Sequence, residues 1–191
     1  FFQIDPEKLE LWKQENALEL SNRLKAVRFA YNHHPLGERL KSSSEPDFVL
    51  LHTLSHIFIS QLAFEAGYSA NALRERIYAF PEVSGYGILV YTAESDSEGS
   101  LGGLQELGKI DKFEKIFIKS INSSSWCSND PVCRESEGVG VQALNRAACH
   151  ACSLLPETTC VYNNTLLDRV LLTGNANDNK ERVKGFFLDL I

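Results

Sequence analysis

The sequence predicts a helix-rich fold of the α/β or α+β class, arranged as a single domain around a small sheet. Apolar residues make up 43% of the 191 residues, which is enough to bury one sizeable core. Segments with helical periodicity also outnumber segments with the period of a strand. A third observation is that all five cysteines lie within residues 127–160, so this part of the chain has a composition of its own.

Two long helices are predicted in the first third of the chain. Asp5 followed by Pro6 is a typical helix start, because the aspartate can cap the helix and the proline stands where no N–H is needed. Apolar residues then recur at helical spacing to about Tyr31. After a polar connection, residues 47–66 form a second helix that is apolar on nearly every side and is capped by Gly67.

A third helix and a strand are predicted next. Ser69 is placed to cap a helix over residues 70–80, "ANALRERIYAF". Residues 87–93, "GILVYTA", form a short, continuous and partly β-branched run. Such a run is typical of a buried strand.

Further helices are predicted in the second half of the chain. An acidic, glycine-rich turn leads into a helix near residue 104, and residues 111–121 form another with one apolar face. Residues 165–173 form a short helix that ends at Gly174. After a polar loop, residues 183–191 form either a final strand or a tail that covers the core.

We expect residues 1–191 to be one domain from the C-terminal part of a larger polypeptide, because the chain begins at Phe1 and contains no methionine. Within it, residues 1–46 form the N-terminal helix and its connection. Residues 47–174 form the core, and this part includes the cysteine-rich segment 127–160.

Charge and hydropathy argue against an extended nucleic-acid surface and against a membrane span. The net charge of −6 gives no overall basic surface for nucleic acid, so any DNA contact is expected to be local or supplied by a partner. The longest apolar run, residues 48–64, is shorter than the roughly 20 residues that cross a bilayer and contains two histidines. We therefore expect a buried helix and no membrane partner.

The cysteine spacing predicts one structural zinc ion. Cys149 and Cys152 form a C-x2-C pair, and a tight turn of this kind presents two sulfurs to one zinc. A redox pair would require a βαβ context that the segment lacks. Disulfides suit small secreted scaffolds and would leave one of five thiols unpaired. Simply buried cysteines remain the plain alternative.

Five cysteines are available for four zinc ligands. We expect Cys149, Cys152 and Cys160 to bind, with either Cys133 or Cys127 as the fourth ligand. Cys133 is favoured because Pro131 stiffens the loop before it. His150 lies inside the C-x2-C turn, and we expect it to point outward.

Several segments together resemble the zinc-binding C-terminal domain shared by MrfA-type DNA-repair helicases and by DrmB of the DISARM anti-phage system, and they are closest to DrmB. The resemblance covers residues 48–174. It rests on "LLHTLSHIFISQLAFEAGYSANALRERIY", "GILVYTAESDSEGSLGGL", "CSNDPVC", "AACHACSLLPETTC" and "NNTLLDRVLL". It implies one zinc on Cys149, Cys152, Cys160 and one of the two upstream cysteines.

The resemblance also implies a role. The chain is expected to be a non-catalytic, zinc-binding scaffold module of a DISARM-like anti-phage complex, or of a helicase-linked DNA-processing complex, in the bacterial cytoplasm. A DrmA-like helicase subunit would be its partner, and it would meet DNA through that complex. Because the chain lacks the G-x4-G-K-[ST] phosphate-binding pattern, it cannot drive a helicase by itself. With a scaffold role, we do not expect this chain alone to be an enzyme.

Two histidines offer an alternative function. His52 and His56 lie one helical turn apart on an apolar helix, where hydrogen-bonded core histidines are the plain interpretation. The alternative is a hydrolase-like or nuclease-like site in which Asp96 or Glu94 orients one imidazole as a general base. A third hypothesis is a module that binds single-stranded DNA directly.

The remaining polar motifs have plain interpretations too. Gly102 and Gly103 at a helix start could hold an anion, or could simply serve a strand-to-helix turn. The acidic loop before them lacks the final glutamate of a calcium loop. Arg74, Arg76 and Arg169 could contact phosphate, but neighbouring carboxylates are the more usual partners.

Overall fold

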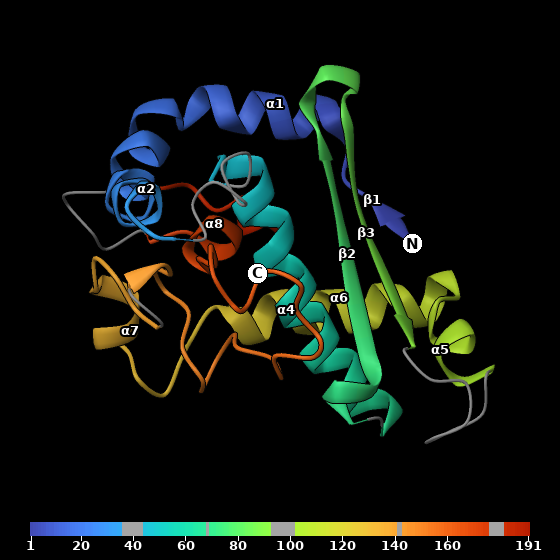
Figure 1. Cartoon of the computed structure of the whole chain (residues 1–191). Coiled ribbons are helices and arrows are strands. Elements are labelled where there is room, and N and C mark those ends of the chain that lie inside the picture. The colour runs from blue at the N-terminus through green and yellow to red at the C-terminus, as the bar shows by residue number, and fades with distance from the viewer. Residues whose placement is uncertain (36–43, 68, 93–101, 141–142, 176–181) are drawn as a thin grey trace.

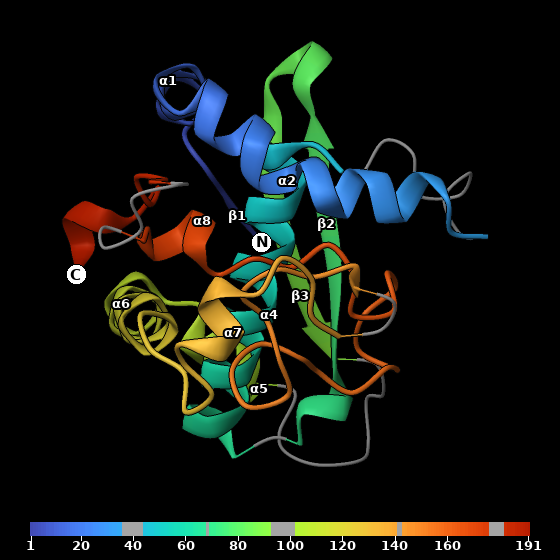
Figure 2. The same ribbon diagram turned by 90° about the vertical axis from the view of Figure 1, so that its left-hand side faces the viewer.

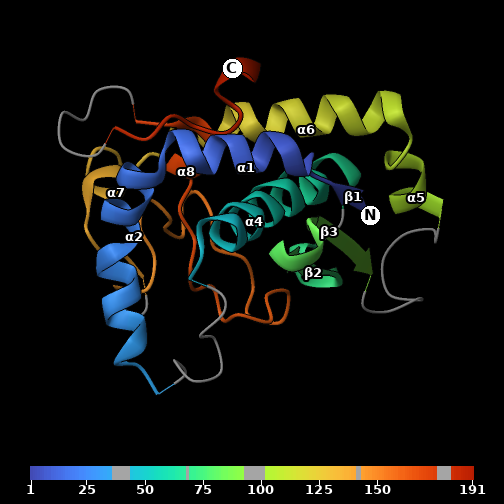
Figure 3. The same cartoon turned by 90° about the horizontal axis from the view of Figure 1, so that it is seen from above.

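One long buried helix, α4 (Pro46–Ala66), passes through the middle of the molecule (Figure 1). The computed structural model describes residues 1–35, 44–67, 69–92, 102–140, 143–175 and 182–191. Seen from above, the sheet lies on one side of α4 and helix α6 (Ile110–Ser124) lies on the other (Figure 3). The other α-helices in the described ranges are α1 (Pro6–Glu15), α2 (Ala17–Asn32), α5 (Gly102–Leu107), α7 (Val132–Glu135) and α8 (Val170–Thr173). The prediction of a helix-rich chain around a small sheet is confirmed.

The sheet is antiparallel and has the strand order β1-β3-β2. Its strands are β1 (Phe2–Gln3), β2 (Leu73–Phe80) and β3 (Gly85–Thr92). The strand predicted over residues 87–93 is confirmed as β3 up to Thr92. A short 3-10 turn, Pro81–Val83, joins β2 to β3.

The predicted helix over residues 70–80 is wrong. Only Ala70–Ala72 form a 3-10 turn, and its N-cap residue Ser69 makes no side-chain capping bond. The rest is β2, which pairs with β3 along its whole length. Leu73, Glu75 and Ile77 therefore all point to the buried face, as the alternation of a strand requires. Tertiary pairing outweighs the helical propensity of this segment.

The first predicted helix is in fact two. The cap at Asp5 is confirmed, since its carboxylate accepts the N–H groups of Glu7 and Lys8 at 3.0 and 3.3 Å. The helix then breaks at the buried Asn16. The side-chain amide of Asn16 donates to the Trp12 carbonyl at 2.9 Å, and its oxygen accepts the N–H of Lys184 at 2.9 Å. The break thus fixes the C-terminal segment against α1.

Helix α4 confirms the second predicted helix. By length and composition it could cross a membrane, but 83% of its apolar window is buried inside the protein, as in the core helix of a folded domain. It ends at Gly67, which has a φ of 68° in the left-handed region. That conformation is favourable for glycine and costly for a residue with a Cβ atom.

Replacing Gly67 by alanine is expected to lower the free energy of unfolding by about 1–2 kcal/mol, the cost of left-handed backbone for an L-residue. An added Cβ would meet no atom within 4 Å, so strain is the only penalty. Gly85→Ala is the matched control. The nearest atom to its added Cβ is 3.5 Å away and its φ is not left-handed, so it should be neutral or slightly stabilising. Urea unfolding of both variants measures the difference, and equal losses would contradict the explanation.

The C-terminal part is more irregular than predicted. Helix α8 is confined to Val170–Thr173, although its end at Gly174 is confirmed. Leu166 has a φ of 61°, which a helix from residue 165 could not contain. The last residues cover the core through the buried side chains of Val183 and Phe187. The predictions of helices near residue 104 and over 111–121 are confirmed by α5 and α6.

Candidate metal centre

Two separate parts of the chain bring four cysteines together. Cys127 and Cys133 lie in the turn after α6 and in α7. Cys149 and Cys152 lie in a second turn, in which the N–H groups of Cys152 and Ser153 donate to the Cys149 carbonyl at 3.1 and 2.9 Å. Cys133 is positioned in the same way, because its N–H donates to the Asn129 carbonyl at 2.9 Å.

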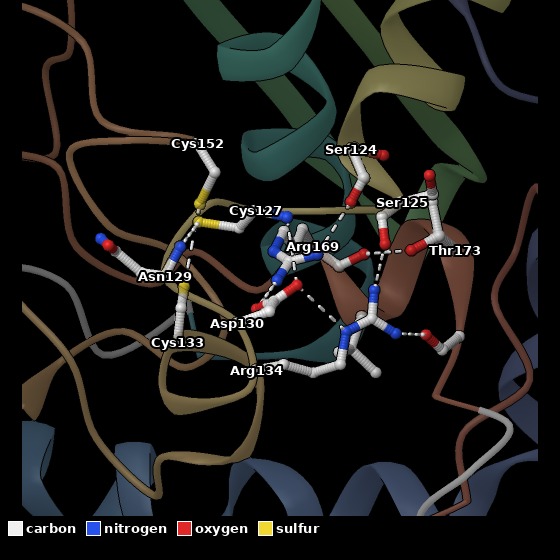
Figure 4. Close-up of polar contacts among 12 residues, drawn as sticks. Ser124, Ser125, Cys127, Asn129, Asp130, Cys133, Arg134, Cys152, Arg169 and Thr173 are labelled. Carbon is white, nitrogen blue, oxygen red and sulfur yellow. Dashed lines mark hydrogen bonds and ion pairs between the residues drawn. The ribbon is translucent and has the colours of Figure 1, made fainter.

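The four sulfur atoms have the spacing of a tetrahedral metal site. The Cys127–Cys149, Cys149–Cys152 and Cys133–Cys152 sulfurs are 3.6, 3.8 and 3.9 Å apart. All four lie within 4.8 Å of one another. Zinc–sulfur bonds of about 2.3 Å at tetrahedral angles separate the sulfurs by roughly 3.8 Å. Figure 4 shows the sulfurs of Cys127, Cys133 and Cys152 pointing toward one another. The geometry fits zinc, and all five cysteines of the chain are free thiols.

Hydrogen-bond donors surround these sulfurs. The Asn129 N–H donates to the Cys127 sulfur at 3.4 Å, and the side-chain amide of Asn129 donates to the Cys149 sulfur at 3.3 Å. The Cys149 N–H and the Ser153 hydroxyl both donate to the Cys152 sulfur at 3.3 Å. Donors of this kind stabilise the thiolate, which is the form that binds metal.

The thiols differ in acidity. The hydrogen bond from Cys133, assisted by Ser153 and the charge of Arg169, lowers the pKa of Cys152 to about 4. The same hydrogen bond to Cys152, together with burial, raises the pKa of Cys133. Desolvation raises the pKa of Cys127. At neutral pH, a zinc ion therefore meets Cys152 as a thiolate and displaces protons from Cys127 and Cys133.

Arg169 supports the first turn from the buried side. Its guanidinium is 0% exposed, contacts the Asp130 carboxylate, and donates to the Ser124 carbonyl at 3.1 Å (Figure 4). The other carboxylate oxygen of Asp130 accepts the Cys127 N–H at 3.1 Å. Because the Arg169 side chain is buried, it cannot contact a phosphate, which the sequence had left open. Its partner is a carboxylate, as the plain interpretation expects.

Cys160 does not join the other cysteines, which corrects the expected grouping with Cys149 and Cys152. A turn in which the Thr159 N–H donates to the Pro156 carbonyl at 2.8 Å leads Cys160 away from them and toward α4. Its sulfur lies 3.1 Å from Nε2 of His52. Both Cys127 and Cys133 belong to the four-cysteine group instead. His150 is exposed and lies outside that group, which agrees with the prediction that it points outward.

His52 and His56 meet a carboxylate that the sequence analysis did not assign to them. Both are 0% exposed, and their Nε2 atoms lie 3.2 and 3.3 Å from Oε1 of Glu75. Asp96 and Glu94, the expected partners, lie outside the described residues. Glu75 was missed because residues 70–80 were predicted to be a helix. The alternation of a strand would have placed it on the same face as Leu73 and Ile77.

Burial controls the charges in this second group. Desolvation lowers the pKa of His52, despite the attraction of Glu75, so its imidazole is neutral at pH 7. Burial opposes the ionisation of Glu75, whereas attraction and hydrogen bonds from the imidazoles, when these carry a positive charge, hold the pKa of its carboxyl well below the usual range. The group therefore contains a carboxylate and an imidazole nitrogen with a lone pair, both of which are metal ligands.

Comparison with known proteins gives two matches. Residues 54–153 match the family model described as the MrfA Zn-binding domain. That range contains the four-cysteine group but not Cys160. The chain is also 38% identical over 174 residues to the DISARM protein DrmB of Bacillus paralicheniformis, an alignment that covers 90% of this chain. The chain spans 30% of the length of that relative. The resemblance inferred from the sequence is confirmed.

Proposed function

Because the chain belongs to the MrfA Zn-binding domain family, we propose that it is a zinc-stabilised, non-catalytic scaffold module of a DISARM-type anti-phage complex in the bacterial cytoplasm. The observation that carries this proposal is the tetrahedral spacing of the Cys127, Cys133, Cys149 and Cys152 sulfurs. Four thiolates complete the coordination of zinc and leave no position for a substrate, which is the arrangement of a structural site.

The scaffold role follows from what the zinc would connect. Cys127 and Cys133 follow α6, which packs against α4, whereas Cys149 and Cys152 precede the segment that leads to Cys160 and α8. An ion between them fixes two irregular segments that have little regular structure of their own. With a net charge of −6, the chain is better suited to contact a partner than to hold DNA by itself, and a helicase subunit of the DrmA type is the partner we propose.

The hydrolase alternative is less well supported by the geometry. A general base must reach the proton that it removes from a substrate. His52 and His56 are 0% exposed, and the carboxylate beside them is Glu75, which is 1% exposed. Burial of all three side chains supports a structural role for this group.

The test uses the full-length protein in cells that carry the complete defence locus. Replacing Cys149 and Cys152 together by serine is expected to abolish both protection against phage and copurification with the helicase subunit, because the zinc-bound surface is lost. His150→Ser, an exposed substitution in the same turn, is the control and should preserve both. A zinc-free double variant that still protects and still copurifies would contradict the proposal.

A further inference from the structure

We propose that His52, His56, Glu75 and Cys160 bind a second zinc ion, in a closed structural site separate from the four-cysteine site. The proposal does not depend on the role in phage defence. The four residues come from three parts of the chain: two from α4, one from β2, and one from the segment before α8. All four are buried, with exposed fractions between 0 and 3%.

The distances between the ligand atoms place all four within reach of one ion. Nε2 of His52 lies 3.1 Å from the Cys160 sulfur and 3.2 Å from Oε1 of Glu75, and Nε2 of His56 lies 3.3 Å from the same oxygen. The four ligand atoms all lie within 4.8 Å of one another. Zinc bonds of about 2.0–2.3 Å to nitrogen, oxygen and sulfur separate tetrahedral ligands by roughly 3.3–3.8 Å, so a bound ion would lengthen the two shortest of these contacts by a few tenths of an ångström.

The orientation of His56 provides a position for a metal ion between its Nε2 atom and the carboxylate of Glu75. Its Nδ1 lies 2.9 Å from the Ser153 carbonyl, which can only accept, so Nδ1 carries the proton and donates. In the neutral imidazole, Nε2 then holds a lone pair directed at the carboxylate of Glu75, and two acceptors face each other. Metal-binding histidines typically have this arrangement, in which one nitrogen donates to a carbonyl and the other binds the ion.

When the two imidazoles are neutral, Glu75 also lacks a compensating positive charge. Its second oxygen, Oε2, has no hydrogen-bond partner among the described residues, although the atom is buried. A buried carboxylate is strongly destabilising unless a positive charge lies close to it. The described ionisable side chains near this carboxylate are His52, His56, Cys160 and Tyr162. None of them carries a permanent positive charge, and a divalent ion bound at this position would supply one.

Cys160 resembles the cysteines of the first site. The Asn164 N–H donates to its sulfur at 3.4 Å, as the Asn129 N–H does to the sulfur of Cys127. Ser153 connects the two groups, because its carbonyl accepts from His56 and its hydroxyl donates to Cys152. The second ion would therefore fix the four-cysteine unit against α4 and the sheet. The chain between α7 and α8 lies along α4 in this region (Figure 2).

The donor set indicates zinc among divalent ions. Two imidazoles, one carboxylate and one thiolate suit a borderline metal, whereas magnesium and calcium prefer oxygen ligands alone. Four protein ligands and full burial describe a closed site without a position for substrate.

Elemental analysis of the purified full-length protein tests the proposal. The quantity of interest is the number of zinc ions that this domain contributes to the total. We expect two zinc ions per domain in the wild type and one in Glu75→Gln, because the amide keeps the shape of the side chain but is a poor zinc ligand. The matched control is Glu82→Gln, an exposed residue just after β2, which should retain two. One zinc in both the wild type and Glu75→Gln would overturn the proposal and leave the four-cysteine site unaffected.

A second measurement needs no variant and so does not depend on folding of a mutant. The wild-type domain is loaded with 113Cd, and its NMR spectrum is recorded. We expect two resonances of equal intensity, one at the shift of an all-thiolate site and one displaced toward the range of mixed nitrogen, oxygen and sulfur ligands. A single all-thiolate resonance would show that a proton, and not a metal, joins the histidines to Glu75.

Discussion

Replacing Cys149 and Cys152 together by serine is expected to unfold residues 127–152 and to remove stability on the order of 10 kcal/mol, the folding free energy that structural zinc typically supplies. The two cysteines hold half of the sulfurs in the four-cysteine group. The chain around them has little regular structure, since α7 contains only four residues. Without the ion, few interactions in this segment offset the backbone entropy that favours its unfolding.

Hydrogen exchange and urea unfolding together measure this effect. Amides of residues 127–152 should lose protection in the double variant, and chelation of the wild-type protein should reproduce the result. His150→Ser is the control, because its exposed side chain lies in the same turn and outside the four-cysteine group. A wild-type protein that contains no zinc and whose native thiols all react freely would disprove the zinc site.

Replacing Arg23 by methionine is expected to lower the free energy of unfolding by about 3–5 kcal/mol, the usual cost of breaking a buried ion pair. Nε and Nη2 of Arg23 donate to the two oxygens of Asp168 at 2.6 and 2.9 Å. Both side chains are 1% exposed. In the variant, the buried carboxylate of Asp168 loses both guanidinium donors and keeps the Val170 N–H, at 3.1 Å.

Arg28→Met provides the matched control in the same helix. Arg28 pairs with Glu45 at 3.0 Å, but the two side chains are 33% and 60% exposed. Solvent screens such a pair, so its loss should cost at most about 1 kcal/mol. A double variant that also replaces Asp168 by leucine should recover part of the loss, because no buried charge is left uncompensated. Equal destabilisation by Arg23→Met and Arg28→Met would contradict this explanation.

Local sequence signals were sufficient for several elements. The Asp5–Pro6 start and the glycine cap at Gly67 each act over one or two helical turns, and the apolar character of α4 lies in one continuous run of the sequence. Their physical causes are capping, burial and backbone conformation, which depend on neighbouring residues. The clustering of the cysteines predicted a zinc site for a similar reason, since thiols seldom gather in one segment without a common ligand.

Long-range pairing decided what the sequence could not. Residues 70–80 contain good helix formers, yet β3 provides a pairing partner along the whole of Leu73–Phe80. This pairing turns the side chain of Glu75 into the protein interior. The helix predicted over residues 70–80 did not indicate that orientation. The split at Asn16 likewise depends on a contact with Lys184, 168 residues away in the chain.

The sequence by itself determined that this is a helix-rich chain with a cysteine-based site of the zinc-binding type, because composition, periodicity and the C-x2-C turn are local properties. Only the tertiary structure decided that Cys127 and Cys133 both approach Cys149 and Cys152, and that Cys160 lies beside His52, His56 and Glu75. The reason is physical: ligands are grouped by distance in space, and the turn at Pro156–Thr159 separates Cys160 from Cys152 although only seven residues lie between them.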